Sequence, residues 1–191
     1  MNGNYFQKIR NYRQKGDNGM EIKDLSKEQL IELLEDFGKR WLAHDGLWFQ
    51  AIEKTRGMDE AIEKDIEAWN HFTKIEAKRI MSFLNLPENG GLEALKEALN
   101  FRLYAVVNKQ EAIQEDENTI IFRMNECRVQ QARQKKNMPL FPCKQVGIVE
   151  YSEFAKTIDS RIKTEVITCP PDEYNGQYYC AWKFTIQEKD E

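Results

Sequence analysis

Cysteines are the residues whose type and spacing most directly indicate chemistry in this chain of 191 residues. All four lie between residues 127 and 180, which points to one local site. Cys169 and Cys180 flank a segment containing Asn175-Gly176, a strong signal for a reversal of the chain, so the two thiols are expected opposite each other. Glu165 lies four residues before Cys169, and on a strand those two side chains share one face.

Sulfur and carboxylate donors at this spacing suit a closed tetrahedral zinc site. The predicted metal ligands are Cys143, Glu165, Cys169 and Cys180, with Cys127 as an alternative ligand in place of Glu165. The competing interpretation is that reduced cysteines act as small buried hydrophobes and fill the core. Isolated cysteines are a less specific signal than paired Cys-x-x-Cys motifs, so the residues alone leave both interpretations open.

Tryptophans and ionisable side chains recur at helical spacing in the N-terminal half of the chain. Such a stripe predicts a buried helix face, where ionisable groups cost free energy unless they are paired or hydrogen-bonded. If two of these faces meet, they form a cavity suited to a small aromatic or heterocyclic ligand. The predicted ligand-binding residues are Trp41, His44, Asp45, Trp48, Asp65 and Trp69.

Two other interpretations of this stripe remain open. The tryptophans can be core residues, with His44 and Asp45 as satisfied structural polar groups. Alternatively His44 is a catalytic general base that Asp45 orients, which makes these two residues the candidate catalytic groups.

The elements that must position these residues can be predicted from hydrophobic periodicity. The capping-box sequence Ser26-Lys27-Glu28-Gln29 begins a helix that Gly57 ends. Further helices are predicted over residues 59–84, 92–108, 128–136 and 143–158, and strands over 119–126, 161–168 and 178–187.

This order of elements predicts an α+β fold with a helical N-terminal half packed on a small antiparallel sheet with helices in the C-terminal half. The expected organisation is a polar N-terminal arm over residues 1–23, a helical subdomain over 24–110 and an α+β subdomain over 111–191. No linker-like segment separates the last two, so they are expected to form one continuous domain.

Composition excludes several classes of partner. The 28 Lys and Arg against 32 Asp and Glu give a net charge of −4, which argues against nucleic acid because no excess of cations exists to displace phosphate counterions. No apolar run approaches the roughly 18 residues of a membrane-spanning helix, and the N-terminus has no signal-peptide core. The expected location is the cytoplasm, where thiols stay reduced.

The C-terminal stretch, about residues 119–187, resembles the vinyl-reductase-type small-molecule-binding domain of chlorophyll-pathway proteins and phenol-responsive activators. The matching segments are Asn125-Glu126-Cys127, Phe141-Pro142-Cys143-Lys144-Gln145-Val146-Gly147, the strand from Glu165 to Cys169, and Gly176 to Cys180 with Trp182-Lys183-Phe184. The resemblance implies a structural zinc on three cysteines and one glutamate, carried over as Cys143, Glu165, Cys169 and Cys180, below a pocket for an aromatic effector. The family's glutamate lies three residues before its cysteine, whereas Glu165 lies four before Cys169.

The whole chain, including Trp41-Leu42-Ala43-His44-Asp45-Gly46-Leu47-Trp48-Phe49, is similar to an uncharacterised family of bacterial and archaeal cytosolic proteins. That family distantly resembles L-2-amino-thiazoline-4-carboxylate hydrolase. Vinyl-reductase-type domains often dimerise, so the resemblance also implies a homodimer.

Together the residues and the resemblance predict a cytosolic, zinc-stabilised domain that binds a small aromatic or heterocyclic molecule. The alternative is a hydrolase acting on a small cyclic or amide-like substrate, with His44 and Asp45 or a bound metal in the site. An enzyme predicts turnover that depends on His44, whereas a binding domain predicts affinity without turnover.

Overall fold

The computed structural model describes residues 20–186. The chain divides after Phe37 into two compact units. The first unit contains a short 3-10 helix, η1 (Ile22–Asp24), and the beginning of α2 (Lys27–Arg56). The second unit contains the rest of α2 and all later elements. The sequence predicted a polar arm over residues 1–23. Residues 1–19 of this arm lie outside the described residues, and its last two residues belong to η1.

The two long N-terminal helices confirm the predicted spans. At the start of α2 the backbone NH of Gln29 donates to Ser26 Oγ at 3.3 Å, and the NH of Ser26 donates to Gln29 Oε1 at 2.7 Å, as a capping box requires. Gly57, with a φ of 95°, separates α2 from α3 (Met58–Leu84). Asn85 ends α3 in the left-handed conformation at a φ of 55°.

The third helix is shorter than predicted. The sequence predicted a helix over residues 92–108, but α4 (Gly91–Leu99) ends earlier and a 3-10 helix, η2 (Leu103–Val106), follows. The reason is a buried ion pair: Arg102 Nε donates to Glu76 Oε2 at 2.9 Å, and the NH of Leu103 donates to Glu76 Oε1 at 2.8 Å. These bonds take the backbone out of the helical path.

The sheet has four strands in the order β1-β2-β4-β3, and every neighbouring pair is antiparallel. Three of them, β2 (Thr119–Glu126), β3 (Ile162–Thr168) and β4 (Cys180–Ile186), confirm predicted strands. The sequence did not predict β1 (Lys109–Asp116), because this edge strand is polar and mostly exposed and so lacks an alternating apolar pattern.

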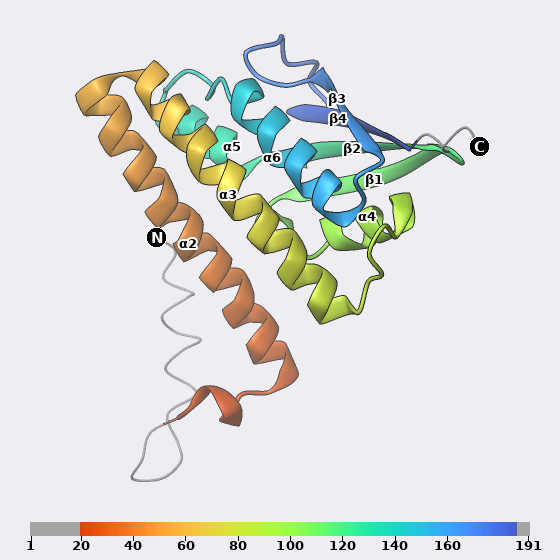
Figure 1. Cartoon of the computed structure of the whole chain (residues 1–191). Coiled ribbons are helices and arrows are strands. Elements are labelled where there is room, and N and C mark those ends of the chain that lie inside the picture. Colours follow the sequence, from red (N-terminus) through yellow and green to blue (C-terminus); the bar gives the residue numbers. More distant parts are fainter. Residues whose placement is uncertain (1–19, 187–191) are drawn as a thin grey trace. The chain divides into compact units, whose positions relative to one another are not determined.

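Helices α6 (Lys144–Ile158) and α3 form successive layers on one face of the sheet, and α5 (Arg128–Lys135) lies near the end of the sheet (Figure 1). The closest approach is at Gly147 of α6, where an added Cβ would lie 2.6 Å from the ring of Trp182 on β4. One hydrophobic core contains side chains from the helices α3, α4 and α6 and from the strands β2, β3 and β4. The fold is therefore α+β, as predicted. No helix within residues 20–186 has the length and apolarity needed to cross a membrane.

Candidate ligand cavity and cysteine cluster

All four cysteines lie at the ends of elements, at one end of the sheet. Cys127 follows β2 and Cys169 follows β3, while Cys180 begins β4 opposite Met124, close to the end of β2. Cys143 directly precedes α6, which packs on the same sheet. Because antiparallel neighbours place the end of one strand beside the start of the next, this topology gathers the thiols into one cysteine cluster.

Within the cysteine cluster, Cys143 Sγ and Cys169 Sγ are 3.6 Å apart. Hydrogen bonding to Cys143 and Cys180, with burial, raises the pKa of the Cys169 thiol far above its ordinary value. Burial raises the pKa of Cys127 to about 12, and Cys143 and Cys180 contribute in the same direction. The raised pKa values mean that the Cys127 and Cys169 thiols hold their protons tightly, so a cation among the sulfurs would be needed to stabilise them as thiolates.

A buried amide supports the cluster from α5. Gln130 Nε2 donates to the carbonyl of Phe141 at 2.9 Å, and Gln130 Oε1 accepts from the NH of Phe141 at 2.8 Å. The same Nε2 lies 3.5 Å from Cys143 Sγ, within hydrogen-bond distance of sulfur. Gln130 is 1% exposed, so this contact is shielded from water. The amide therefore fixes the segment that carries Cys143.

The loop after Cys169 is attached to the start of α6. Asp172 accepts from the backbone NH of Cys169 at 3.1 Å and from Lys144 Nζ at 2.6 Å. The NH of Lys144 donates to the carbonyl of Pro170 at 2.9 Å. These bonds hold Cys169 beside the residue that precedes the helix, which is Cys143.

Glu165 is not part of the cluster. It lies on the exposed face of β3, opposite Lys183 of β4, whereas Cys169 is 1% exposed. Among residues 20–186, no three His, Cys, Asp or Glu side chains already surround a common point as metal ligands would. The four cysteines line one cavity, but their side chains are not arranged around one centre.

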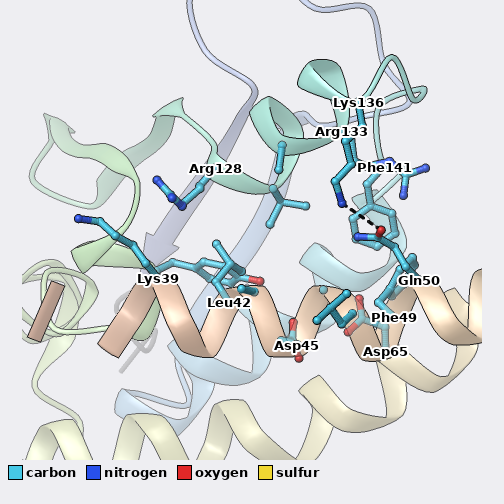
Figure 2. A pocket seen from close by; sticks show the side chains of 16 residues that line it. Lys39, Leu42, Asp45, Phe49, Gln50, Asp65, Arg128, Arg133, Lys136 and Phe141 are labelled. Atoms are coloured by element: carbon cyan, nitrogen blue, oxygen red, sulfur yellow. Dashed lines mark hydrogen bonds between the residues drawn. The ribbon is translucent and has the colours of Figure 1, made fainter. Parts of the chain in front are cut away.

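A second candidate site is a cavity of about 360 Å³ between α2, α3 and α5, called here the outer cavity (Figure 2). Its walls are mainly apolar, and basic side chains are distributed around it, with Lys39 and Arg128 at one end and Arg133 and Lys136 at the other. The apolar part of the wall includes Leu42, Ala43, Phe49, Val129, Ala132 and Phe141.

Asp45 of α2 and Asp65 of α3 form an aspartate pair that lines the outer cavity. Burial, then the charges of Asp45 and Glu150, raise the pKa of Asp65 from 3.8 to about 7, although a hydrogen bond from the side chain of Trp69 acts in the opposite direction. Burial also raises the pKa of Asp45, partly offset by His44. Two carboxyls therefore share a site in which holding both charges is unfavourable.

Tyr104 lines the outer cavity, and two tryptophan rings pack against it. Tyr104 of η2 lies on the buried ring of Trp69, with ring centroids 5.5 Å apart in a stacked arrangement. Trp41 contacts the same Tyr104 edge to face at 5.6 Å. Burial raises the pKa of the Tyr104 hydroxyl well above its ordinary value, and Glu150 and the aspartate pair contribute further. The hydroxyl thus stays protonated at neutral pH and can donate a hydrogen bond.

Behind these rings lies a buried group with more acidic than basic side chains. Arg102 Nε is 2.9 Å from Glu76 Oε2, and Arg102 Nη2 is 2.7 Å from Glu150 Oε1. The guanidinium also lies over the rings of Trp69 and Tyr151, 5.8 and 5.1 Å from their centroids. One cation thus faces two glutamates, and Glu150 adds to the negative field at Asp65.

A smaller cavity of about 70 Å³, the inner cavity, lies between the outer cavity and the cysteine cluster. The two cavities share Asp65, Tyr104, Val129 and Phe141, and the inner cavity is also lined by all four cysteines. The indole Nε1 of Trp182, another lining residue, is buried without a hydrogen-bond partner. The two candidate sites are therefore neighbours in one cavity system.

Residues 23–186 match the model of a protein family described as a family of unknown function, DUF6125. The chain is a member of that family. A search of curated proteins found no match.

Solved structures with a similar fold are distant in sequence. The phenol-responsive sensory domain of the transcription activator PoxR, in a crystal structure with phenol, matches with a TM-score of 0.51 at 13% identity, over 82% of this chain and 77% of that chain. A trafficking protein particle complex subunit 3 from Naegleria fowleri, covalently bound to palmitic acid, matches with a TM-score of 0.46 at 10% identity, over 85% and 98%.

The residues predicted as ligand-binding separate into two groups. Asp45 and Asp65 line the outer cavity, and Trp69 lines the inner one. Trp41 is half-buried against Tyr104 without lining either cavity. His44 is exposed, and Trp48 is 64% exposed, and neither lines a cavity. The two aspartates meet, but the predicted tryptophan walls do not form.

Sequence analysis missed several residues of this DUF6125 site. Tyr104 lies in a stretch predicted as helix, and Glu150 is a single acidic residue within an otherwise apolar helix face. Gln130 belongs to a short, mostly polar helix whose pattern does not indicate an inward face. Of the three, only Glu150 had a usable signal, because a carboxylate on an apolar stripe requires a buried partner.

Proposed function

We propose that this DUF6125 protein is a cytoplasmic, zinc-stabilised domain that binds a small molecule in the outer cavity, related to vinyl-reductase-type domains. The observation that carries the proposal is the convergence of four cysteines from separate elements beside a largely apolar cavity. The PoxR sensory domain, which has a similar fold and whose crystal structure contains phenol, is consistent with a small-molecule ligand.

The donor set fits zinc better with Cys127 than with Glu165. In a tetrahedral site with Zn–S bonds of about 2.3 Å, the sulfurs lie about 3.8 Å apart. Cys143 and Cys169 are already 3.6 Å apart, and Cys127 and Cys180, which line the same inner cavity, would have to turn toward them to complete the set. Glu165 would have to leave an exposed strand face to take part. The proposed ligands are therefore Cys127, Cys143, Cys169 and Cys180.

A four-cysteine shell has no open position, so the zinc would be structural rather than catalytic. Zinc would hold the ends of β2, β3 and β4 to the start of α6. Gln130 would act as a supporting donor to Cys143 Sγ, as residues around zinc sites commonly do.

Elemental analysis of purified protein tests the ligand set. We expect near-stoichiometric zinc in the wild type and in Glu165→Gln, and loss of zinc in Cys127→Ser and Cys169→Ser. Glu165→Gln is the matched control, because it removes the other predicted donor. Wild-type protein without metal, prepared without chelator, would reject the zinc part of the proposal. If Glu165→Gln loses zinc and Cys127→Ser retains it, the ligands are instead the set with the glutamate, namely Cys143, Glu165, Cys169 and Cys180.

A hydrolase is the second candidate, and one observation favours it. Asp65 has a pKa of about 7 and lies in a cavity beside Asp45, as an acid–base group at neutral pH would. The exposed His44 is not in that cavity. In this case Asp65→Asn abolishes hydrolysis of a small cyclic amide while His44→Ala does not. Absence of turnover across such substrates leaves binding as the function.

A further inference from the structure

The aspartate pair lies in a largely apolar cavity that four basic residues also line, namely Lys39, Arg128, Arg133 and Lys136. Among residues 20–186, no ion pair joins Asp45 or Asp65 to a lysine or arginine. A carboxylate held in such surroundings costs free energy until a proton or a cation compensates it. A ligand that supplies the positive charge would remove this cost.

Two of the four basic side chains that line the outer cavity, Arg133 and Lys136, are held by other partners. Arg133 Nη1 and Nη2 donate to the two carboxylate oxygens of Glu53, at 2.9 and 3.0 Å, and Lys136 Nζ donates to Gln50 Oε1 at 3.2 Å. The first of these is a bidentate pair, which is strong and geometrically fixed. These two groups line the cavity and form no ion pair with the aspartates.

The field behind the aspartate pair is also negative. Glu76 and Glu150 face the single guanidinium of Arg102, and the charge of Glu150 raises the pKa values of both Asp65 and Tyr104. An anionic group placed against Asp65 would therefore be repelled from two sides. A neutral hydroxyl would leave at least one carboxylate without compensation.

We propose that the ligand of the outer cavity carries a protonated amine or amidinium on a compact apolar body, and that Asp45 and Asp65 receive its N–H donors. The apolar walls, including Leu42, Phe49 and Phe141, would enclose the body of the ligand. This inference rests on the proposed small-molecule-binding function and specifies the chemical class of its ligand.

Three probes of nearly equal size separate charge from shape: benzylamine, benzyl alcohol and benzoate. Calorimetric titration of the wild type at pH 8 should give a dissociation constant of about 1 mM or tighter for benzylamine, within the range for so small a molecule. The alcohol and the acid should each bind at least about tenfold more weakly. Backbone NMR shifts should place the benzylamine site around Asp45 and Asp65.

Matched variants then test whether benzylamine binding depends on the aspartate pair. Asp45→Asn and Asp65→Asn should each weaken benzylamine binding at least about tenfold, with little effect on benzyl alcohol. Glu67→Gln is the control, because it removes one negative charge from an exposed position on the same helix. Equal weakening in Glu67→Gln would mean that net charge, not the pair, attracts the amine, and would overturn the inference.

The outcomes also separate this inference from the proposed function. Benzyl alcohol or benzoate binding in the cavity more tightly than benzylamine would overturn the amine specificity and leave small-molecule binding intact. Failure of benzylamine to bind folded wild type would likewise overturn the amine inference. Failure of a broad set of neutral, anionic and cationic small molecules to shift any cavity resonance would reject the binding function itself.

Discussion

The cysteine cluster and the aspartate pair occupy neighbouring parts of one cavity system, but the protein supports them in different ways. The thiols lie at the ends of four packed elements, with Gln130 and the loop around Asp172 holding their backbone. The aspartates approach from two helices, and within residues 20–186 neither has a cationic partner in an ion pair. Hydrogen bonds hold the backbone of the cysteine cluster in place, whereas no ion pair in the described part of the protein compensates the charge of the aspartate pair.

Under the proposed function, the cysteine cluster serves the fold and the aspartate pair serves a ligand. A set of sulfurs supported by buried hydrogen bonds stabilises the structure when a metal joins it. An unbalanced carboxyl pair destabilises the folded state, and such groups are found preferentially at functional sites. Stability measurements should therefore give opposite signs for substitutions at the two places.

The largest effect is expected at the cysteine cluster. Cys180→Ser should lower the free energy of unfolding by more than about 4 kcal/mol, because structural zinc in small peptides contributes roughly 10–16 kcal/mol. Urea unfolding at neutral pH, followed by circular dichroism, measures the change. If the variant does not fold, a chelator added to the wild type provides the same comparison and should lower Tm. A chelator without effect and a fully stable Cys180→Ser would mean that the cysteines only fill space.

The opposite sign is expected for Asp65→Asn. The pKa of Asp65 is about 7 in the folded state and 3.8 as a free side chain, so between those pH values the folded protein binds more protons than the unfolded chain. Stability contributed by this group therefore falls as pH rises from about 4 to 7. Relative to the wild type, Asp65→Asn should gain on the order of 4 kcal/mol over that window.

Urea unfolding of wild type and Asp65→Asn at pH 4, 6 and 8 checks this slope. The two charged groups that act on Asp65, Asp45 and Glu150, are retained in the variant together with the neutral Tyr104 hydroxyl, so the difference isolates the aspartate. Glu67→Gln should follow the wild-type profile. Parallel profiles for wild type and Asp65→Asn would show that Asp65 is not held in a destabilising site.

The cysteine end could be predicted from sequence because its signals are local. Asn175-Gly176 indicated the reversal and periodicity indicated β3 and β4, so the approach of Cys169 and Cys180 was predictable, whereas Cys143 was assigned through the family resemblance. The prediction that Glu165 shares a strand face with Cys169 was less secure. The register shift between Val166 and Thr168 breaks the alternation on which its placement relied.

The aspartate end was predictable only in part, because its geometry depends on long-range packing. Helical spacing placed Asp45 and Asp65 on facing helices, but it also placed Trp48 inward, where the structure has it exposed. Tyr104 enters the site through the turn that the Arg102 ion pair produces, and no local pattern indicated that turn. Buried ion pairs between distant elements are not visible in periodicity.

The smallest effect is expected for substitution of Trp48, which can be compared with Trp69. Trp48 is 64% exposed and Trp69 is 6% exposed, although both were predicted to line one cavity. Trp48→Ala should change the free energy of unfolding by no more than about 0.5 kcal/mol, as for exposed residues without partners in the core. It should also leave benzylamine affinity unchanged.

Trp69→Phe is the matched variant, because it keeps an aromatic ring and removes the hydrogen bond to Asp65 and part of the stack on Tyr104. We expect it to shift the pKa of Asp65 further upward and to weaken benzylamine binding at neutral pH, since the bond that favours the carboxylate is lost. Calorimetric titration of both variants decides between the two positions. If Trp48→Ala weakened binding as much as Trp69→Phe, the ligand would extend along the exposed face of α2, and the aspartate pair would no longer define the site.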